Sequence, residues 1–362
     1  MKKITSLALF VLTISVLSFS AEKNSKPVLK FNSNGEFKIA QFTDLHFQYN
    51  SYRSDSALTI IKEVVKAEKP DLLVFTGDIV ISNETYLAWL SLSKVMINAK
   101  VPWAVTFGNH DIEHALKGDQ IMEILAGMPF SMTENGPKNI SGNGNYILKI
   151  QSLKSSKTAA VLYFFDSHSA YPQGQKGKWD YIKYDQIEWY RKLSSKLVKA
   201  NGNNLLPALA FFHIPLPEYK EIKSTIVGIH RETVTPAEIN SGLYCAMLES
   251  KDVMGIFTGH NHNNNYIGCL HNICLAFGNV TGRECYGDIG RGARIIKLYE
   301  GERKFSTWIL KLYECNRQKD TWIPVTDRQP MFFVTYPDTF IHTEETGNGY
   351  IEFMNNPVKV NE

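Results

Sequence analysis

The sequence predicts an α/β fold in which parallel strands are joined by helices. Five apolar, strand-like runs are continuous rather than alternating, as in strands that are covered on both faces. Helical patterns separate the first three runs, and the order strand, helix, strand, helix, strand implies crossover connections in a parallel sheet. Each of the five runs ends on Asp, Asn or His, so the strand ends also carry the candidate chemistry.

The residues that follow the five runs have side chains that bind metal ions. In chain order, the runs are residues 38–43 before Asp44-Leu45-His46, 71–76 before Gly77-Asp78, 101–107 before Gly108-Asn109-His110-Asp111, 209–212 before His213, and 253–258 before Gly259-His260-Asn261-His262. In open α/β sheets the carboxyl ends of the strands form the ligand-binding edge. We therefore expect one cluster of Asp, Asn and His at one edge of a sheet, able to hold two metal ions side by side.

Local geometry explains how these side chains can meet. Residues two apart on an extended strand share a side, so Asp44 and His46 can reach one metal ion if the strand continues that far, and the same holds for His260 and His262. Asp78 follows a glycine, where the chain can turn sharply, and its two carboxylate oxygens can bridge two cations. Each motif alone is more typical of a turn or a core histidine. Only the ordered occurrence of all five favours a metal site.

The helices are expected from apolar residues at helical spacing. The first follows a candidate N-cap, Ser54, and its periodic residues are Ala57, Ile60, Ile61, Val64 and Val65. A second pattern runs from Tyr86 to Ile97, and a third covers residues 185–198. Residues 131–146 are rich in Ser, Asn and Gly and are expected to form a loop. Further strands are predicted at residues 159–165, 274–277, 294–298 and 307–312.

Three segments are expected along the chain. Residues 1–20 are typical of a secretory signal peptide, because Lys2 and Lys3 precede an apolar stretch and small residues near position 20. That stretch is shorter than the roughly 20 residues of a membrane span, which disfavours an uncleaved anchor. Residues 36–312 form the expected metal-binding domain, and 313–362 are either a closing hairpin or an appendage. We expect export to the periplasm or the medium, and the Met-Lys-Lys start is typical of bacteria.

Charge and cysteine usage restrict the partners. The chain has 39 Lys and Arg against 36 Asp and Glu, and removal of residues 1–20, which hold two lysines and no acids, leaves 37 against 36. This balance gives no basis for binding to nucleic acid or to a membrane surface. The five cysteines form no Cys-x-x-Cys pair, which argues against a thiolate zinc site. Cys269 and Cys274 either bridge a short hairpin or stay free, and the odd count leaves at least one cysteine without an intrachain partner.

The motif order Asp-x-His, Gly-Asp, Gly-Asn-His-Asp, His and Gly-His-x-His resembles the calcineurin-like metallophosphoesterase superfamily over residues 36–300. The segment Phe-Phe-His-Ile-Pro-Leu-Pro-Glu at 211–218, and Cys-Tyr-Gly at 285–287 leading to Arg-Gly-Ala-Arg at 291–294, resemble its short, single-domain purple-acid-phosphatase-like branch. The resemblance implies a four-layer α/β/β/α sandwich with a dinuclear metal site at the C-terminal ends of strands. One departure is Ile81, which stands where true purple acid phosphatases have a tyrosine ligand, so their purple colour is not expected here.

The resemblance also implies the role of each site residue. The first metal ion would be held by Asp44, His46, Asp78 and His262. The second would be held by Asp78, Asn109, His213 and His260. His110 would be the catalytic histidine near the leaving group. Asp111 would either orient His110 or serve in a turn or helix cap.

An activity follows from this expected site. Two metal ions about 3.5–4 Å apart neutralise a phosphate ester, clamp the attacking and leaving oxygens, and acidify a water molecule so that hydroxide is available near neutral pH. We expect an exported phosphomonoesterase that uses two ions of Mn, Fe or Zn on a small phosphorylated substrate. A phosphodiesterase or nucleotidase of the same fold is the alternative. A non-catalytic binding module is less favoured, because the set of expected ligands is complete.

Overall fold

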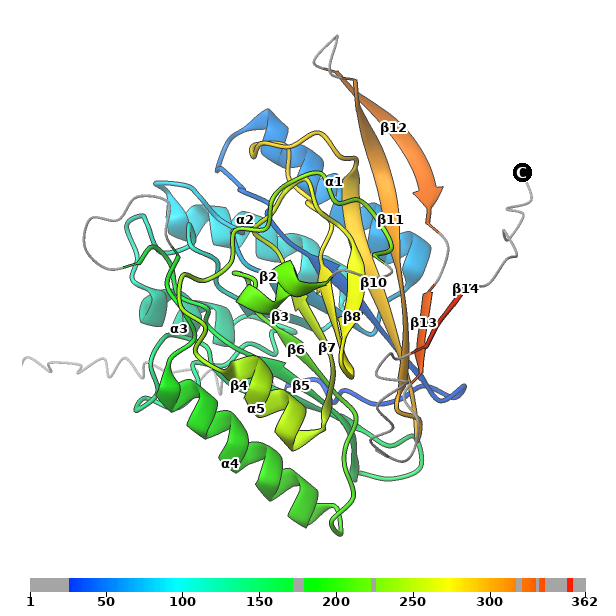
Figure 1. Cartoon of the computed structure of the whole chain (residues 1–362). Helices are drawn as coiled ribbons and strands as arrows, with labels where there is room; N and C mark the ends of the chain where they lie inside the picture. The colour runs from blue at the N-terminus through cyan, green and yellow to red at the C-terminus, as the bar shows by residue number, and fades with distance from the viewer. Residues whose placement is uncertain are drawn as a thin grey trace, which may run out of the picture.

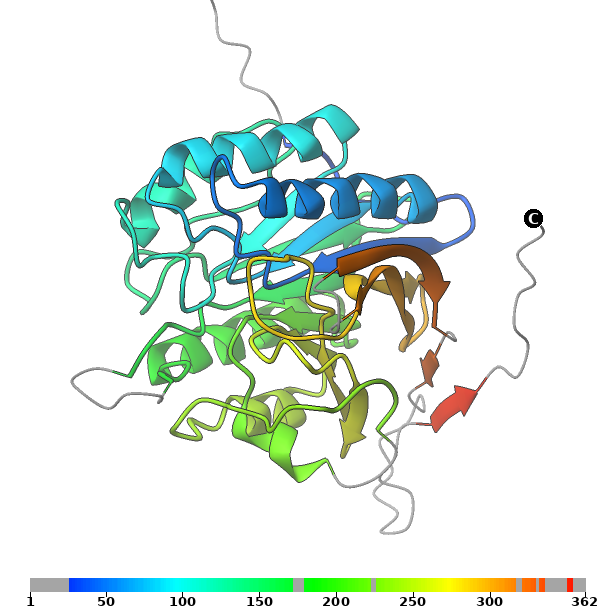
Figure 2. The same cartoon turned by 90° about the horizontal axis from the view of Figure 1, so that it is seen from above.

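The computed structural model describes residues 26–171, 179–222, 226–316, 321–329, 332–335 and 350–353. The expected signal peptide, residues 1–20, lies outside the described residues. Two sheets pack face to face at the centre of the molecule, and helices cover both outer faces (Figures 1 and 2). This arrangement confirms the four-layer α/β/β/α sandwich that the resemblance implied.

The first sheet places three parallel strands at one edge. Its spatial order is β14-β13-β11-β10-β1-β2-β3, with β12 also paired to β11. The bounds are β1 Glu36–Phe42, β2 Leu72–Thr76, β3 Trp103–Thr106, β10 Arg291–Tyr299, β11 Lys304–Asn316, β12 Thr321–Arg328, β13 Phe332–Thr335 and β14 Tyr350–Phe353. Phe42 pairs with Phe75, and Thr76 pairs with Thr106, so β1, β2 and β3 end close to one another.

The second sheet contains the remaining two metal-motif strands. Its order is β4-β5-β6-β7-β9-β8, and β5, β6, β7 and β9 pair in parallel. The bounds are β4 Tyr146–Gln151, β5 Thr158–Phe164, β6 Ala208–Phe211, β7 Val253–Thr258, β8 Ile267–Leu270 and β9 Ile273–Phe277. The expectation of a single sheet edge is therefore wrong, because β1–β3 and β6–β7 belong to different sheets. Strands of both sheets are covered on both faces, so their sequence patterns do not separate them.

Among the described residues, five α-helices form the outer layers. They are α1 Tyr52–Glu68, α2 Thr85–Ala99, α3 Gly118–Ala126, α4 Tyr184–Ala200 and α5 Leu243–Ser250, with a short 3₁₀ helix at Pro217–Glu221. Helices α1 and α2 lie over the first sheet, and α4 and α5 lie over the second (Figure 2). Ser51 precedes α1, so the N-cap expected at Ser54 is wrong. Ser54 lies in the first turn instead, where its hydroxyl accepts a hydrogen bond from the N–H of Gln48.

Three buried apolar layers hold the four structural layers together. Ile60 of α1 packs in one cluster with Phe42, on the outer side of the first sheet. Val74 and Phe211 meet in the central cluster between the sheets. Tyr190 of α4 belongs to the third cluster, outside the second sheet. Each central strand is thus buried on both faces, which explains its continuous apolar sequence.

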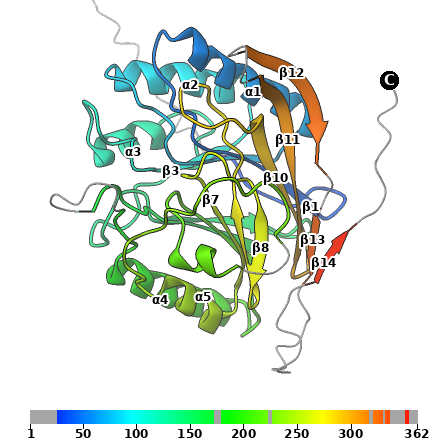
Figure 3. The same cartoon turned by 45° about the horizontal axis from the view of Figure 1, so that its top comes forward.

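The described part of residues 313–362 extends the first sheet. Strand β11 continues across the boundary expected at residue 312, and β12 folds back to pair with it (Figure 3). Trp322 on β12 lies over the guanidinium of Arg291, with its ring centroid 4.5 Å from Cζ. This stacking connects the extension to the loop between β9 and β10.

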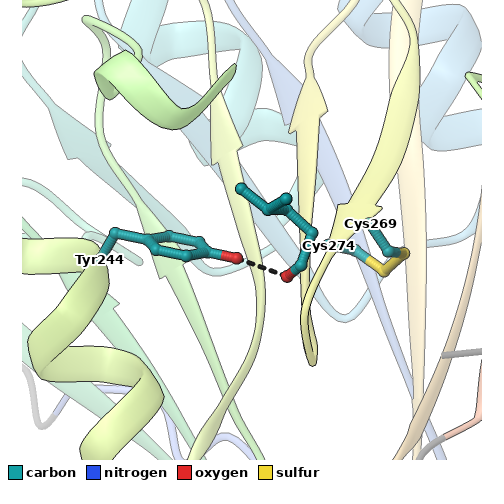
Figure 4. Close-up of a disulfide and its surroundings, with 4 residues drawn as sticks. Tyr244, Cys269 and Cys274 are labelled. Carbon is teal, nitrogen blue, oxygen red and sulfur yellow. Dashed lines mark hydrogen bonds between the residues drawn. A yellow bond between two sulfur atoms is a disulfide. The ribbon is translucent and has the colours of Figure 1, made fainter. Parts of the chain in front are cut away.

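A disulfide closes the hairpin of β8 and β9. Cys269 and Cys274 are directly opposed in the register of the two strands, and the bond joins them (Figure 4). The hydroxyl of Tyr244, on α5, donates a hydrogen bond to the carbonyl of Leu270 in the same hairpin.

Within the part of the chain that the structure describes, no helix combines the length and apolar character needed to cross a membrane.

Candidate metal centre

Two groups of ligand atoms share one carboxylate. Asp44, His46, Asp78 and His262 form the first group. Asp78, His213 and His260 form the second. Within each group the donor atoms lie within 4.8 Å of one another, and all six residues are buried. Asp78 therefore lies between two sets of side chains, each of suitable size and chemistry for a metal ion.

The side chains reach the cluster from left-handed backbone positions rather than from extended strand. Strand β1 ends at Phe42, and φ is +52° at Asp44 and +47° at His46. Asp78 and His260 also have positive φ, at +50° and +77°. The chain is therefore not extended at Asp44 and His46, as the strand geometry would have required, yet both side chains reach the same cluster. Asp and His tolerate this region better than most residues, and such strain is concentrated at functional sites.

Two glycines allow the loops to approach this closely. Gly77 has φ of +84°, and a Cβ there would lie 2.5 Å from the ring of His213. At Gly259, a Cβ would lie 1.9 Å from Oγ1 of Thr43 and 2.7 Å from Oδ2 of Asp44. Any side chain at either position would push strand ends of the two sheets apart. The glycines before Asp78 and His260 are therefore steric requirements of the site.

Backbone carbonyls orient two of the imidazoles. Nδ1 of His213 lies 2.8 Å from the carbonyl oxygen of Thr76, and Nδ1 of His262 lies 3.2 Å from that of Tyr286. A carbonyl only accepts, so each Nδ1 carries the proton, and in the neutral ring each Nε2 has a free lone pair. These Nε2 atoms face carboxylates, since that of His262 lies 3.1 Å from Asp44 Oδ1. Both rings thus present a ligand atom to the cluster.

Two buried imidazole nitrogens without hydrogen bonds are suited to bind a cation. Nε2 of His46 and Nε2 of His213 are buried and make no hydrogen bond. They lie 3.6 Å and 3.2 Å from Oδ2 of Asp78, the carboxylate common to both groups. A buried polar atom without a partner is costly, and coordination to a metal ion would satisfy it. The chemistry of these donors therefore fits divalent metal ions.

The buried carboxylates and imidazoles of the cluster have strongly shifted pKa values, and the direction of the shift differs between the imidazoles. Burial disfavours ionised Asp44, but the charge and hydrogen bond of His262 together with the charge of His213 outweigh it and lower the pKa of Asp44 to about 2. Burial lowers the pKa of His46 to about 4 and, reinforced by the charge of His213, that of His260 to about 3. For His213, burial is outweighed only by the charge and hydrogen bond of Asp78 together with Asp44 and the carbonyl of Thr76, and the pKa rises to about 9. The pKa of His262 is also raised well above its usual value, by the charges of Cys285 and Asp44 against burial. His46 and His260 are therefore neutral near pH 7, whereas His213 and His262 must first lose a proton to bind a metal.

The Gly-Asn-His-Asp motif supplies residues with three different contacts. The amide oxygen of Asn109 is buried and lies 2.9 Å from Nδ1 of His260, beside the second group. The N–H of His110 donates to Oδ1 of Asp78 at 2.8 Å, while its partly exposed ring lies 5.5 Å from the ring of His46. Nδ1 of His110 pairs with Oε2 of Glu113 at 2.7 Å. His110 is thus beside the cluster but outside both groups.

Asp111 is a turn residue and makes no contact with the His110 ring among the hydrogen bonds of the described residues. Its Oδ1 accepts from the N–H groups of Ile79 and Val80, and its Oδ2 accepts from that of Gly108. The carboxylate therefore joins the loop after β2 to the loop after β3. Glu113 takes the orienting role that was one alternative for Asp111. Its position three residues after His110 is a spacing that sequence reasoning missed.

The structure brings together every residue expected at the site, whereas a second Asp-x-His sequence, the lookalike motif Asp166-Ser167-His168, lies outside the cluster. Asp166 accepts hydrogen bonds from the N–H groups of Asn143 and His168, and Nε2 of His168 pairs with Gln186. Neither residue belongs to the Asp and His groups of the cluster.

A family model described as calcineurin-like phosphoesterase matches residues 37–264. The chain belongs to the calcineurin-like phosphoesterase family. "Probable inactive purple acid phosphatase 29" of Arabidopsis thaliana is 32% identical over 339 residues, covering 83% of this chain and 86% of that protein. "Phosphatase DCR2" of Saccharomyces cerevisiae is 33% identical, covering 77% of this chain and 54% of that protein. The crystal structure of a dimetal phosphatase from Danio rerio superposes with a TM-score of 0.53 at 10% identity, over 80% of this chain and 98% of that one, which supports the fold.

This calcineurin-like phosphoesterase also has aromatic residues around the cluster that the motifs did not reveal. The ring of Tyr286 stacks on His262 with centroids 3.9 Å apart, and its hydroxyl donates to Glu232. The rings of Trp179 and His260 lie nearly perpendicular to each other, with centroids 4.6 Å apart. Tyr286 lies in the Cys-Tyr-Gly segment that pointed to the family, but nothing in its sequence context indicated the stack. Both rings limit the movement of a proposed metal ligand.

Proposed function

We propose that this protein is a dinuclear-metal-dependent phosphoesterase that hydrolyses phosphate monoesters. One observation carries the proposal: Asp78 is shared by two buried groups of Asp and His donors. Two adjacent metal sites that share a carboxylate are typical of enzymes that displace groups at phosphorus. Membership of the calcineurin-like phosphoesterase family supports the reaction class.

The proposed ligand sets follow the geometry. The first ion would be held by Asp44, His46, Asp78 and His262. The second would be held by Asp78, His213 and His260, with the neighbouring amide oxygen of Asn109. When bound, the two ions would neutralise the anionic ester and lower the pKa of water at the site. The mixed nitrogen and oxygen donors suit Mn, Fe or Zn better than Mg or Ca.

The chain itself would contribute at the leaving group. His110 is fixed through its N–H to Asp78, and Glu113 holds Nδ1 of its ring. The carboxylate of Glu113 accepts from Nδ1–H, so Nε2 would donate a proton to a departing alkoxide from the cationic imidazolium and keep a free lone pair afterwards. Because His110 is partly exposed, a substrate can reach it from solvent. We propose a small phosphorylated substrate and an exported protein, on the basis of residues 1–20.

A second candidate function is a non-catalytic binding module. The names of Arabidopsis relatives at 30–32% identity contain the words "probable inactive". Against this alternative stands the complete set of buried donors in the present chain.

A phosphodiesterase of the same fold is also compatible with the metal groups, and substrate preference separates it from a monoesterase.

The test uses the purified chain without residues 1–20, freed of metal and reconstituted separately with Mn, Fe and Zn. Hydrolysis of a nitrophenyl phosphate monoester is compared with that of a diester. We expect faster monoester turnover that is lost with a chelator and in Asp78→Asn. Faster diester turnover would change the assignment to a phosphodiesterase. Metal binding without turnover of either ester would favour the binding module.

A further inference from the structure

A thiol lies beside the first group of proposed ligands. Sγ of Cys285 falls within 4.8 Å of ligand nitrogens of both His46 and His262, and these three residues form a further potential metal-binding group. Cys285 is partly buried and belongs to the loop between β9 and β10. It is not in a disulfide. The two histidines are the same ones that would hold the first metal ion.

The position of this thiol is fixed by the backbone on both sides. Sγ lies 3.5 Å from the carbonyl oxygen of Asp44 and 3.4 Å from that of Gly282. Arg291 holds the loop, since its guanidinium donates to the carbonyls of Gly282 and Ile289. The S–H is a weak donor, so replacing these contacts by a metal bond costs little. The thiol is therefore held in place by its loop, but its own hydrogen bonds are weak.

A second observation points to a cation at the same place. Nε2 of His46 is buried without a hydrogen bond, and the residue as a whole is 8% exposed. Nε2 of His262 faces Asp44, because Nδ1 is taken by the carbonyl of Tyr286. The sulfur thus neighbours the imidazole of His46, whose Nε2 makes no hydrogen bond, and that of His262, whose Nε2 faces the cluster. Two imidazoles and a thiolate are the donors that zinc prefers.

We propose that Cys285 is a sulfur ligand of the first metal ion, in addition to the Asp and His ligands. This inference rests on the proposed function, because it requires metal at that site. On binding, the S–H bond is broken, the proton passes to solvent, and the thiolate electron pair forms the metal–sulfur bond. A soft thiolate biases the site toward Zn or Fe and away from Mn and Mg.

The test uses cobalt as a spectroscopic probe in the metal-free chain without residues 1–20. Bound Co²⁺ gives ligand-field bands in the visible range whatever its ligands, whereas a thiolate ligand adds a charge-transfer band in the near ultraviolet. We expect both signals in the native chain. Cys285→Ser should lose the near-ultraviolet band, keep the visible bands and bind Co²⁺ about 10-fold more weakly. Cys245→Ser is the matched control, because Cys245 is an exposed free cysteine on α5.

Alkylation gives an independent readout. A thiolate bound to metal reacts slowly, so Zn²⁺ should protect Cys285 from iodoacetamide and leave Cys245 equally reactive, as followed by peptide mapping. Visible cobalt bands without the near-ultraviolet band, together with unprotected Cys285, would overturn the sulfur ligand and leave the proposed metal function intact. Failure of the chain to bind Co²⁺ at all would overturn both.

Discussion

The backbone N–H of His110 donates a hydrogen bond of 2.8 Å to Oδ1 of Asp78. The other oxygen of this carboxylate faces Nε2 of His213 and of His46. The residue common to both metal groups therefore also positions the proposed leaving-group histidine. Under the proposed function, metal binding and acid catalysis would be coupled through this one side chain.

Asp78→Asn should separate charge from hydrogen bonding. The amide oxygen can still accept from the N–H of His110, but the negative charge shared by the two metal groups is lost. We expect affinity for both ions to fall by about 100-fold or more, measured by metal analysis after dialysis at fixed free metal. His168→Ala is the control, since it alters the lookalike Asp-x-His motif outside the cluster. Retention of two tightly bound ions in Asp78→Asn would contradict the shared role.

His110→Ala should reduce turnover while leaving metal affinity unchanged, in contrast to Asp78→Asn. The ring is outside both metal groups, so metal content should be unchanged. Turnover of an ester with a poor leaving group should fall by about 100-fold or more, because protonation of the alkoxide is lost. A nitrophenolate leaving group needs less protonation, so its turnover should fall less. Equal losses for both esters would indicate that His110 only positions the substrate.

Much of this arrangement was predictable from sequence, for a definite physical reason. A metal ligand must follow a strand end closely, so Asp44, Asp78 and His213 each appear directly after an apolar run. The division into two sheets was not predictable, because burial on both faces gives β2 and β6 the same apolar pattern.

Contacts made through space were also missed. Tyr286 meets His262 because Arg291 folds the intervening loop, and no spacing in the sequence encodes that fold. The contact between Glu113 and His110 is different, because the two residues are only three positions apart and their spacing in the sequence could have predicted it. Local pairs can be read from sequence, whereas pairs created by a loop fold cannot.

From pH 6.5 to 9, the stability of the metal-free protein and the extra stability gained on metal binding should change in opposite directions. Without metal, the pKa of His213 is raised from 6.5 to about 9, because burial is outweighed by the charge and hydrogen bond of Asp78 together with the charge of Asp44 and the carbonyl of Thr76. A raised histidine pKa stabilises the fold fully below about 6.5, and this stabilisation is lost as the pH rises through about 9. Metal ions must displace the same proton, so their affinity rises over that window.

Thermal unfolding from pH 6.5 to 9, with and without a chelator, measures both trends. The unfolding temperature in chelator should fall across the window, while the increase in that temperature produced by Zn²⁺ should grow. His213→Asn, which cannot titrate there, should reduce both slopes. A metal-induced increase that shrinks toward pH 9 would refute the assignment of His213 as a protonated ligand.

Asp111 should matter for stability more than for chemistry. Asp111→Ala leaves the N–H groups of Ile79, Val80 and Gly108 without their acceptor in a buried turn. We expect the free energy of unfolding to fall by about 3–5 kcal/mol, measured by denaturant titration in chelator. Asp111→Asn keeps one acceptor oxygen and should lose about half as much. Exposed Asp55→Ala is the control and should stay within about 0.5 kcal/mol of the native chain.

Arg291 should govern the loop that carries Cys285 and Tyr286. It is fully buried and donates to the carbonyls of Gly282, Tyr286 and Gly287 among others. Arg291→Lys retains the charge but loses the planar fork of donors, so the loop should open locally. We expect amide hydrogen exchange over residues 282–289 to accelerate by about 10-fold or more, in proportion to the lost hydrogen bonds.

A second buried arginine of the same strand provides the matched control for this prediction. Arg294 donates to the carbonyls of Phe277 and Asn265 and to Thr307, away from the 282–289 loop. Arg294→Lys should therefore lower global stability without selective exchange in that loop. Trp322→Ala removes the ring stacked on Arg291 and should accelerate loop exchange to a smaller extent. If Arg291→Lys and Arg294→Lys gave the same exchange pattern, Arg291 would be a general core residue, and the loop around His262 would depend on other contacts.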